Sequence, residues 1–298
     1  MLILTAIPAD ADFSLNTVSG FLLPSPSRAS PLPVPPRCGG RWQTSPVTRL
    51  PPNSAVPGGA LPGCRPALLA ELAARLCALS PGRRILAAVD GVDGAGKTMF
   101  ADALAAELSA ASAGRPVLRV SLDDFHHRQN VRHRRGRTSA VGFRLDSYDL
   151  QQFRTYVLAP LGPGGSGCYR AAGHCLDTDD VLDPPAVAAA SNAVVLVDGL
   201  FLHGSELAAY WDFSIFLDVP FAVTAARMAV RDGTPADPEH PAMHRYVGGQ
   251  RLYFADSDPA ARAAVVVENS DPGRPRIISA AEASYRRPGE PEHCRKHS

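Results

Sequence analysis

The stretch at 91–98 reads Gly91-Val92-Asp93-Gly94-Ala95-Gly96-Lys97-Thr98 and fits G-x-x-x-x-G-K-[ST] at every fixed position. An apolar run at 84–90 precedes it and a helical pattern at 97–111 follows it, which is the context that this motif requires. Glycines in such a loop let backbone N–H groups surround phosphate oxygens, and the helix N-terminus adds the positive end of its dipole. The lysine places a charge on the β- and γ-phosphates, and the threonine offers a hydroxyl group to Mg²⁺. The stretch therefore predicts a site for ATP and Mg²⁺ formed by Gly91, Asp93, Gly94, Ala95, Gly96, Lys97 and Thr98.

Short apolar runs alternate with helical periodicities on both sides of this loop. Strands are predicted at 84–90, 116–122, 193–197, 213–219 and 264–268, and helices at 67–79, 97–111, 149–161, 221–231 and 242–255. Uninterrupted apolar runs are typical of strands that are buried on both faces, and strands that alternate with helices form a parallel sheet. The predicted fold class is therefore α/β, a parallel sheet with helices on both faces.

Proline content divides the chain into unequal parts. Residues 1–66 hold 13 of the 28 prolines, only two acidic residues and no apolar periodicity. Such a segment buries too little apolar surface to offset the entropy of ordering it. We predict a disordered Pro-rich extension at 1–66, one domain at 67–282 and a disordered tail at 283–298. A Pro-rich docking arm, or translation from a later start codon, is an alternative for the first segment.

The charge balance excludes the simplest partners. Thirty basic residues against 29 acidic ones give a net charge of +1, so no global polycation attracts nucleic acid or an anionic membrane. No run of 18 apolar residues exists, the start lacks a basic signal region, and the six cysteines form no C-x-x-C pair. We therefore predict a cytoplasmic, reduced protein with a small-molecule substrate; a homo-oligomer stays open. Lys97 is one of only two lysines.

Two acidic residues are predicted at the carboxyl ends of strands beside the loop. Asp198 follows the run at 194–197, and Asp123 follows the strand at 116–122. The carboxyl ends of parallel strands meet at one edge, so Asp198 is predicted to hold Mg²⁺ with Thr98, and Asp123 to take the proton of an attacking hydroxyl group. Alternatively, Asp198 merely ends a strand, and Asp123 with its neighbour Asp124 forms a solvated pair. Asp218 is predicted to be structural.

From about residue 83 to 269, the order of these motifs resembles the uridine kinase family, which phosphorylates the 5′-hydroxyl group of uridine or cytidine. The resemblance rests on the loop at 91–98, on Leu122-Asp123-Asp124-Phe125-His126, on Arg144-Leu145-Asp146-Ser147-Tyr148-Asp149, and on Arg227-Met228-Ala229-Val230-Arg231-Asp232. It implies a P-loop NTPase fold with a helical lid, ATP and Mg²⁺ as cofactors, Asp123 as the base and a nucleoside as the acceptor.

The resemblance also implies roles for residues on the acceptor side. Asp149 would bind ribose hydroxyl groups, and Tyr169 and His174 in a hairpin, with His126, would contact the nucleoside. Arg227 and Arg231, four residues apart on one side of a lid helix, would close over the phosphates and act with Lys97 and Asp123 in catalysis. The alternatives are that Ser147 or Asp149 only caps a helix, that the hairpin is an ordinary surface hairpin, and that the two arginines are solvated.

Two segments depart from the family pattern. Residues 126–137 contain five arginines and three histidines without an acid, and either bind a phosphate or an acidic nucleotide, or form a solvated loop. Gly and Pro at 232–235 shorten the lid. Both departures leave open a P-loop kinase for another small alcohol, such as pantothenate or a sugar phosphate. A non-catalytic ATP-binding regulator is the alternative outside enzymes.

Overall fold

The structure is a computed structural model that describes residues 64–112 and 114–286. Residues 1–63 of the predicted extension and residues 287–298 of the predicted tail lie outside the described residues. The division into extension, domain and tail therefore stays a prediction. Within the described part, no helix is both long and apolar enough to cross a membrane.

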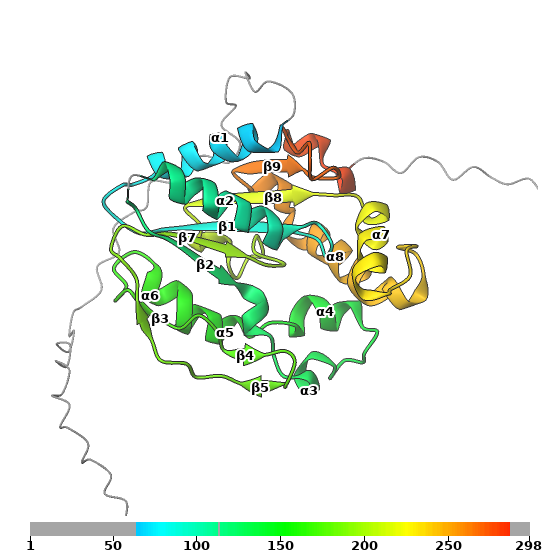
Figure 1. Cartoon of the computed structure of the whole chain (residues 1–298). Coiled ribbons are helices and arrows are strands. Elements are labelled where there is room, and N and C mark those ends of the chain that lie inside the picture. Colours follow the sequence, from blue (N-terminus) through cyan, green and yellow to red (C-terminus); the bar gives the residue numbers. More distant parts are fainter. Residues whose placement is uncertain (1–63, 113, 287–298) are drawn as a thin grey trace, which may run out of the picture. The chain divides into compact units, whose positions relative to one another are not determined.

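A six-stranded sheet forms the centre of the described part (Figure 1). Its order is β10 (Arg276–Ile278), β9 (Val265–Glu268), β8 (Phe213–Asp218), β1 (Ile85–Gly91), β7 (Val194–Asp198) and β2 (Val117–Ser121). Five strands run parallel, which confirms the predicted α/β class, and the sequence reading missed the sixth, β10, which pairs antiparallel to β9. β1, β7 and β8 are buried at every position, as their uninterrupted apolar runs indicate.

Helices cover both faces of this sheet (Figure 1). On one face, α1 (Arg65–Ala78) and α2 (Lys97–Ala111) pack against alternate β1 residues such as Ala87. On the other face, Leu86 and Ala88 pack against a segment that the sequence predicts as one helix at 149–161. The structure divides that helix into α5 (Leu150–Phe153), a π-helical turn (Arg154–Leu158) and α6 (Ala159–Leu161).

Four of the remaining helices lie around the carboxyl edge of the sheet (Figure 1). They are α3 (Gln129–Arg132), α4 (Ala140–Asp146), α7 (Phe221–Asp232) and α8 (His244–Ser257), whereas α9 (Pro259–Arg262) directly precedes β9. α7 ends at Gly233, whose φ of +70° is the left-handed conformation that favours glycine at a helix end. α4 packs against α8, although neither α3 nor α4 is predicted from the sequence.

The predicted hairpin that carries Tyr169 and His174 is part of a longer antiparallel hairpin. Tyr169 lies in β3 (Cys168–Tyr169), which pairs with β6 (Val187–Ala188). His174 lies in β4 (His174–Cys175), which pairs with β5 (Asp180–Val181). The second pair is nested inside the first, and Leu182 N donates to the backbone O of Gly173 between them, so Tyr169 and His174 lie on the same arm of one hairpin.

The chain is still packed where the sequence predicts the tail to begin. Ala283 is buried, and Ser284 donates hydrogen bonds from its backbone N and its Oγ to the two carboxylate oxygens of Asp218. Tyr285 stacks on Phe254 of α8 with ring centroids 4.1 Å apart. Asp218 therefore has the structural role that the sequence predicts for it.

Candidate functional site

The loop at 91–98 connects β1 to α2 at the carboxyl edge of the sheet. Gly94 and Gly96 have φ values of +73° and +86°, which L-residues with side chains rarely adopt. A Cβ atom at Gly94 would lie 2.8 Å from the backbone O of Thr224 in α7, so the close approach of the lid helix also requires glycine there. Lys97 Nζ donates to the backbone O of Val92 at 3.0 Å, which places the ammonium group over the loop itself.

Thr98 and Asp198 meet as the sequence predicts. Thr98 Oγ1 donates to Asp198 Oδ2 at 2.8 Å, and the Asp198 side chain is only 2% exposed. Register explains the meeting, because Asp198 pairs with Val89 near the end of β1 and with Ser121 at the end of β2. A hydroxyl and a carboxylate oxygen side by side are hard oxygen ligands, so these residues fit Mg²⁺.

Arg119 of β2 also binds Asp198, and the sequence reading missed it. Its Nη2 donates to Asp198 Oδ1 at 3.0 Å, while its Nε donates to Asp102 Oδ1 on α2 at 3.0 Å. A guanidinium group therefore compensates the buried charge of Asp198. The only signal for this contact was an arginine inside a predicted strand.

Asp123 stands in a short 3-10 turn directly after β2. Its Oδ1 accepts a hydrogen bond from Tyr148 Oη at 2.8 Å, and its backbone O accepts one from His126 Nδ1 at 2.8 Å. Burial lowers the pKa of His126, so its ring is neutral at pH 7 and its Nε2 carries a lone pair. Burial raises the pKa of the neighbouring Asp124, and the charges of Asp123 and Asp198 raise it further.

Asp93, in the P-loop, interacts with charges of both the P-loop and the turn at Asp123. Gln250 Nε2 of α8 donates to Asp93 Oδ2 at 3.0 Å. Burial raises the pKa of the Asp93 carboxyl group; the ammonium group of Lys97 opposes this shift, and the charge of Asp123 adds to it. The predicted phosphate-binding and base residues therefore lie close enough for their charges to interact.

The two lid arginines have different surroundings, although both lie on α7. Arg227 donates from Nη1 to the backbone O of Gly94 at 3.1 Å and from Nη2 to the backbone O atoms of Asn269 and Ser270 at 3.0 and 2.8 Å. Arg231 pairs with Asp232 and is 64% exposed, and the charges of Asp93 and Asp123 contribute to its raised pKa after its bond to Asp232. Arg227 thus ties α7 to the P-loop, whereas Arg231 binds its neighbour Asp232 and feels the charges of Asp93 and Asp123.

The predicted acceptor residues fall into different environments. Asp149 caps α5 through Oδ1, which accepts from Gln152 N at 2.8 Å, while its Oδ2 lies 3.7 Å from His127 Nδ1. His174 is buried and lies beside the turn of Asp123, since Gly173 N donates to the backbone O of Asp124 at 2.9 Å. Tyr169 is buried in the hydrophobic cluster on that face of the sheet.

The comparisons with known proteins bear on the fold. No protein-family model matches the chain, and no curated protein matches it. A structure of a possible uridine kinase from Bacillus stearothermophilus is similar with a TM-score of 0.53 and 18% identity, over 66% of this chain and 96% of that chain. A candidate fructose transport system kinase from Silicibacter sp. TM1040 gives 0.48 and 26%, over 63% and 95% of the two chains. The chain has the fold of a P-loop NTPase.

A buried network behind the P-loop was not predicted. Asp90 is fully buried at the end of β1, and it accepts hydrogen bonds from Gly91 N at 2.7 Å, from His203 Nδ1 at 2.7 Å and from Tyr253 Oη. These contacts join the first residue of the P-loop to the segment after β7 and to α8. The sequence near Asp90 indicates only an acid inside an apolar strand. Its two partners lie more than a hundred residues away, so no local pattern predicts this network.

Most of the basic segment at 126–137 is exposed, and two acids from elsewhere in the chain offset part of its charge. Arg128 and Arg132 lie 3.9 and 3.7 Å from carboxylate oxygens of Asp179. Arg134 and Arg135 both bind Asp146, the latter at 2.9 Å. Two carboxylates therefore face four of the five arginines, and both predicted states, a phosphate site and a solvated loop, stay predictions.

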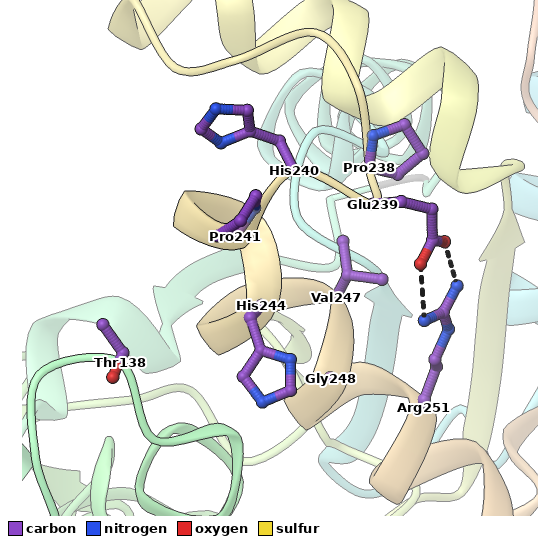
Figure 2. Close-up of a pocket in the computed structure, with 9 residues that line it drawn as sticks. All are labelled: Thr138, Pro238, Glu239, His240, Pro241, His244, Val247, Gly248 and Arg251. Atoms are coloured by element: carbon purple, nitrogen blue, oxygen red, sulfur yellow. Dashed lines mark hydrogen bonds and ion pairs between the residues drawn. The ribbon is translucent and has the colours of Figure 1, made fainter.

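A cavity of about 520 Å³ lies between Thr138, residues 238–241 and α8 (Figure 2). Figure 2 shows Arg251 at its wall, bonded through two nitrogens to Glu239, with His240 and His244 near the opposite side. None of the residues that the sequence predicts for the functional site lines this cavity.

Proposed function

We propose that the protein is a P-loop kinase that transfers the γ-phosphoryl group of ATP to a primary alcohol, with the 5′-hydroxyl group of uridine or cytidine as the leading acceptor. The observation that supports this proposal is the meeting of three groups at one sheet edge: Lys97 on the P-loop, the Thr98–Asp198 pair, and Asp123. Phosphoryl transfer needs these parts, namely a phosphate cradle, a metal site and a proton acceptor.

The donor side is formed by the P-loop and α2. Backbone N–H groups between Gly94 and Thr98 and the ammonium group of Lys97 would bind the phosphates of ATP. Thr98 and Asp198 would hold Mg²⁺, which neutralises phosphate charge when it is bound. Arg231 would add a guanidinium group to this cage, whereas Arg227 supports it by fixing α7 to the P-loop.

The acceptor side is formed by the turn after β2 and its neighbours. Asp123 would orient the acceptor hydroxyl group and take its proton. The lone pair of His126 Nε2 and the carboxylate of Asp149 would bind acceptor hydroxyl groups, with His174 beside them; these roles rest on the resemblance to uridine kinases. Asp146 and Asp179 offset only part of the charge of the basic segment, so a phosphorylated acceptor stays the alternative to a neutral one.

A radiolabelled-ATP transfer assay across nucleosides, pantothenate and pentose phosphates tests the acceptor. We expect transfer to uridine or cytidine. Transfer only to pantothenate or to a sugar phosphate would replace the acceptor but keep the kinase. A protein that binds ATP and transfers phosphate to none of these compounds would favour the non-catalytic regulator.

The substitution Asp123→Asn tests the base. Because a positioned general base contributes about 10²- to 10⁴-fold to the rate, we expect kcat to fall by that factor while the Kd for ATP stays nearly constant. Asp124→Asn is the matched control, since its carboxyl group is adjacent and has an elevated pKa. Full activity in the Asp123 variant together with loss in the Asp124 variant would move the base by one residue.

A further inference from the structure

Tyr148 contacts the proposed base directly. Its Oη donates to Asp123 Oδ1 at 2.8 Å, although Asp123 is exposed and the tyrosine is buried. Among the described residues, no hydrogen bond engages the other carboxylate oxygen, Oδ2. The contact therefore makes the two oxygens of Asp123 different from one another.

Backbone hydrogen bonds hold the two segments together. His127 N donates to the backbone O of Ser147 at 2.9 Å, and Asp149 N donates to that of Phe125 at 2.8 Å. These bonds flank an antiparallel bridge between His126 and Tyr148, whose rings lie 4.5 Å apart. Paired residues of an antiparallel bridge place their side chains on the same face. The turn of Asp123 and the ring of Tyr148 thus form one unit.

Phe201, in the segment after β7, supports the other side of the Tyr148 ring. The two rings meet edge to face with centroids 6.4 Å apart, and Phe201 also packs against Phe143 at 5.6 Å and Tyr253 at 5.1 Å. Phe201 has a φ of +64°, a conformation that bulky residues adopt only where the surrounding packing enforces it. The position of the phenol is therefore set by tertiary packing.

The phenol can act only as a donor. Burial raises the pKa of Tyr148 well above its ordinary value, and the charge of Asp123 raises it further. At neutral pH the hydroxyl group keeps its proton, so it cannot compete with Asp123 as a base. A carboxylate that accepts a hydrogen bond on one oxygen keeps its negative charge for a proton on the other.

We propose that Tyr148 is a positioning residue for phosphoryl transfer: its phenol holds Oδ1 of Asp123 so that Oδ2 receives the proton of the acceptor. This inference rests on the proposed function. In the step, the acceptor O–H bond breaks and its proton moves to Asp123 Oδ2. The acceptor oxygen forms a bond to the γ-phosphorus, the bond from that phosphorus to the β–γ bridging oxygen breaks, and ADP leaves with the electron pair.

Tyr148→Phe tests the proposal in the full chain, because it keeps the ring and removes only the donor. We expect kcat to fall about tenfold, the loss of one hydrogen bond to a charged group, with the KM values for ATP and acceptor unchanged. Tyr156→Phe is the matched control: its phenol donates to Asp183 Oδ1 at 2.9 Å, and it should change neither quantity.

A second measurement does not depend on turnover. With ¹³C-labelled aspartate, and with Asp123→Asn to assign the signal, the chemical shift of the Asp123 carboxyl carbon at pH 7 should change in Tyr148→Phe, because the hydrogen bond to Oδ1 is lost, and stay at its wild-type value in Tyr156→Phe. A Tyr148→Phe variant that matches the wild type in kcat and in this chemical shift overturns the proposal. A wild-type protein that transfers phosphate to no alcohol overturns the proposed function instead, and the chemical shift then shows whether Tyr148 holds Asp123 all the same.

Discussion

The two carboxylate oxygens of Asp198 bind different partners. One oxygen binds Thr98 of the P-loop, where Mg²⁺ is proposed to bind, and the other binds Arg119 of β2. Arg119 also contacts Asp102, whose side chain is 64% exposed, whereas that of Asp198 is 2% exposed. Surface ion pairs contribute little to stability, whereas a buried charge needs its partner. Loss of the bond between Arg119 and Asp198 should therefore destabilise the fold much more than loss of the bond between Arg119 and Asp102.

Asp198→Asn should weaken the binding of Mg²⁺ and lower the free energy of unfolding. Loss of the carboxylate charge removes a proposed metal ligand and leaves Arg119 with the exposed Asp102 and the backbone O of Leu196 as partners. We expect the Mg²⁺ concentration for half-maximal activity to rise at least tenfold, measured by titration at saturating ATP. Asp102→Asn removes the exposed partner alone, and should leave the Mg²⁺ dependence unchanged and the free energy of unfolding within about 0.5 kcal/mol of the wild type. An equal effect of both variants would contradict the metal role.

Helices α4 and α8 meet through glycine. A Cβ atom at Gly249 would lie 2.7 Å from Phe143 Cδ1 and 2.9 Å from the backbone O of Ala140, and one at Gly248 would lie 2.9 Å from Ala140 Cβ. α8 also carries Gln250, which binds Asp93, and Tyr253, which binds Asp90. The spacing of α4 and α8 therefore determines how the acceptor side faces the P-loop.

Gly249→Ala should have two opposing effects on the stability of the fold. Alanine gains about 1 kcal/mol over glycine inside a helix, but overpacking costs typically 1–3 kcal/mol, and the backbone of Ala140 has little room to move. We expect net destabilisation of about 1–2 kcal/mol in urea denaturation. Gly82→Ala is the control, since a Cβ atom there meets nothing within 4 Å and should be neutral or slightly stabilising. Equal stability of the two variants would show that the helices can separate without cost.

At the scale of the whole described part, the carboxylate of Asp258 helps to tie the chain beyond β10 back to α8 and α9. Asp258 binds Arg286 and accepts from Tyr285 Oη at 2.7 Å. The hydrogen bond from Arg286 holds the pKa of Asp258 below its usual range, and the bond from Tyr285 adds to the shift against the opposing effect of burial. A group with a depressed folded-state pKa stabilises the fold above its unfolded pKa, about 4, and loses that contribution as the pH falls through the folded value.

Asp258→Asn should therefore lower stability at pH 7 and have a vanishing effect near pH 2. Asn tolerates the φ of +43° at this position, so the variant changes the charge and not the backbone. Because half of the Asp258 side chain is exposed, the difference at pH 7 should stay within about 1 kcal/mol. Urea denaturation of both proteins from pH 2 to 8 measures it, and a difference that is constant over this range would disprove the linkage.

Much of the fold was predictable because its signals are local. The buried strands, the P-loop and the helices after it are each encoded in a contiguous run, and the structure has them within a few residues of the predicted bounds. The hairpin at 168–188 was expected only from the family resemblance and not from periodicity, because its strands are two residues long. The antiparallel β10 was missed for the same reason, since it is only three residues long.

The sequence by itself determined the donor side: spacing alone specifies the loop that curls around phosphate, and apolar runs specify the strands that place Asp123 and Asp198 at one edge. Tertiary structure decided what each of these groups touches. Tyr148 on Asp123, Arg119 on Asp198, and His203 with Tyr253 on Asp90 are contacts between residues 25 to 163 positions apart. The physical reason is that strand order, register and loop packing create these contacts, and no local pattern of residues records them.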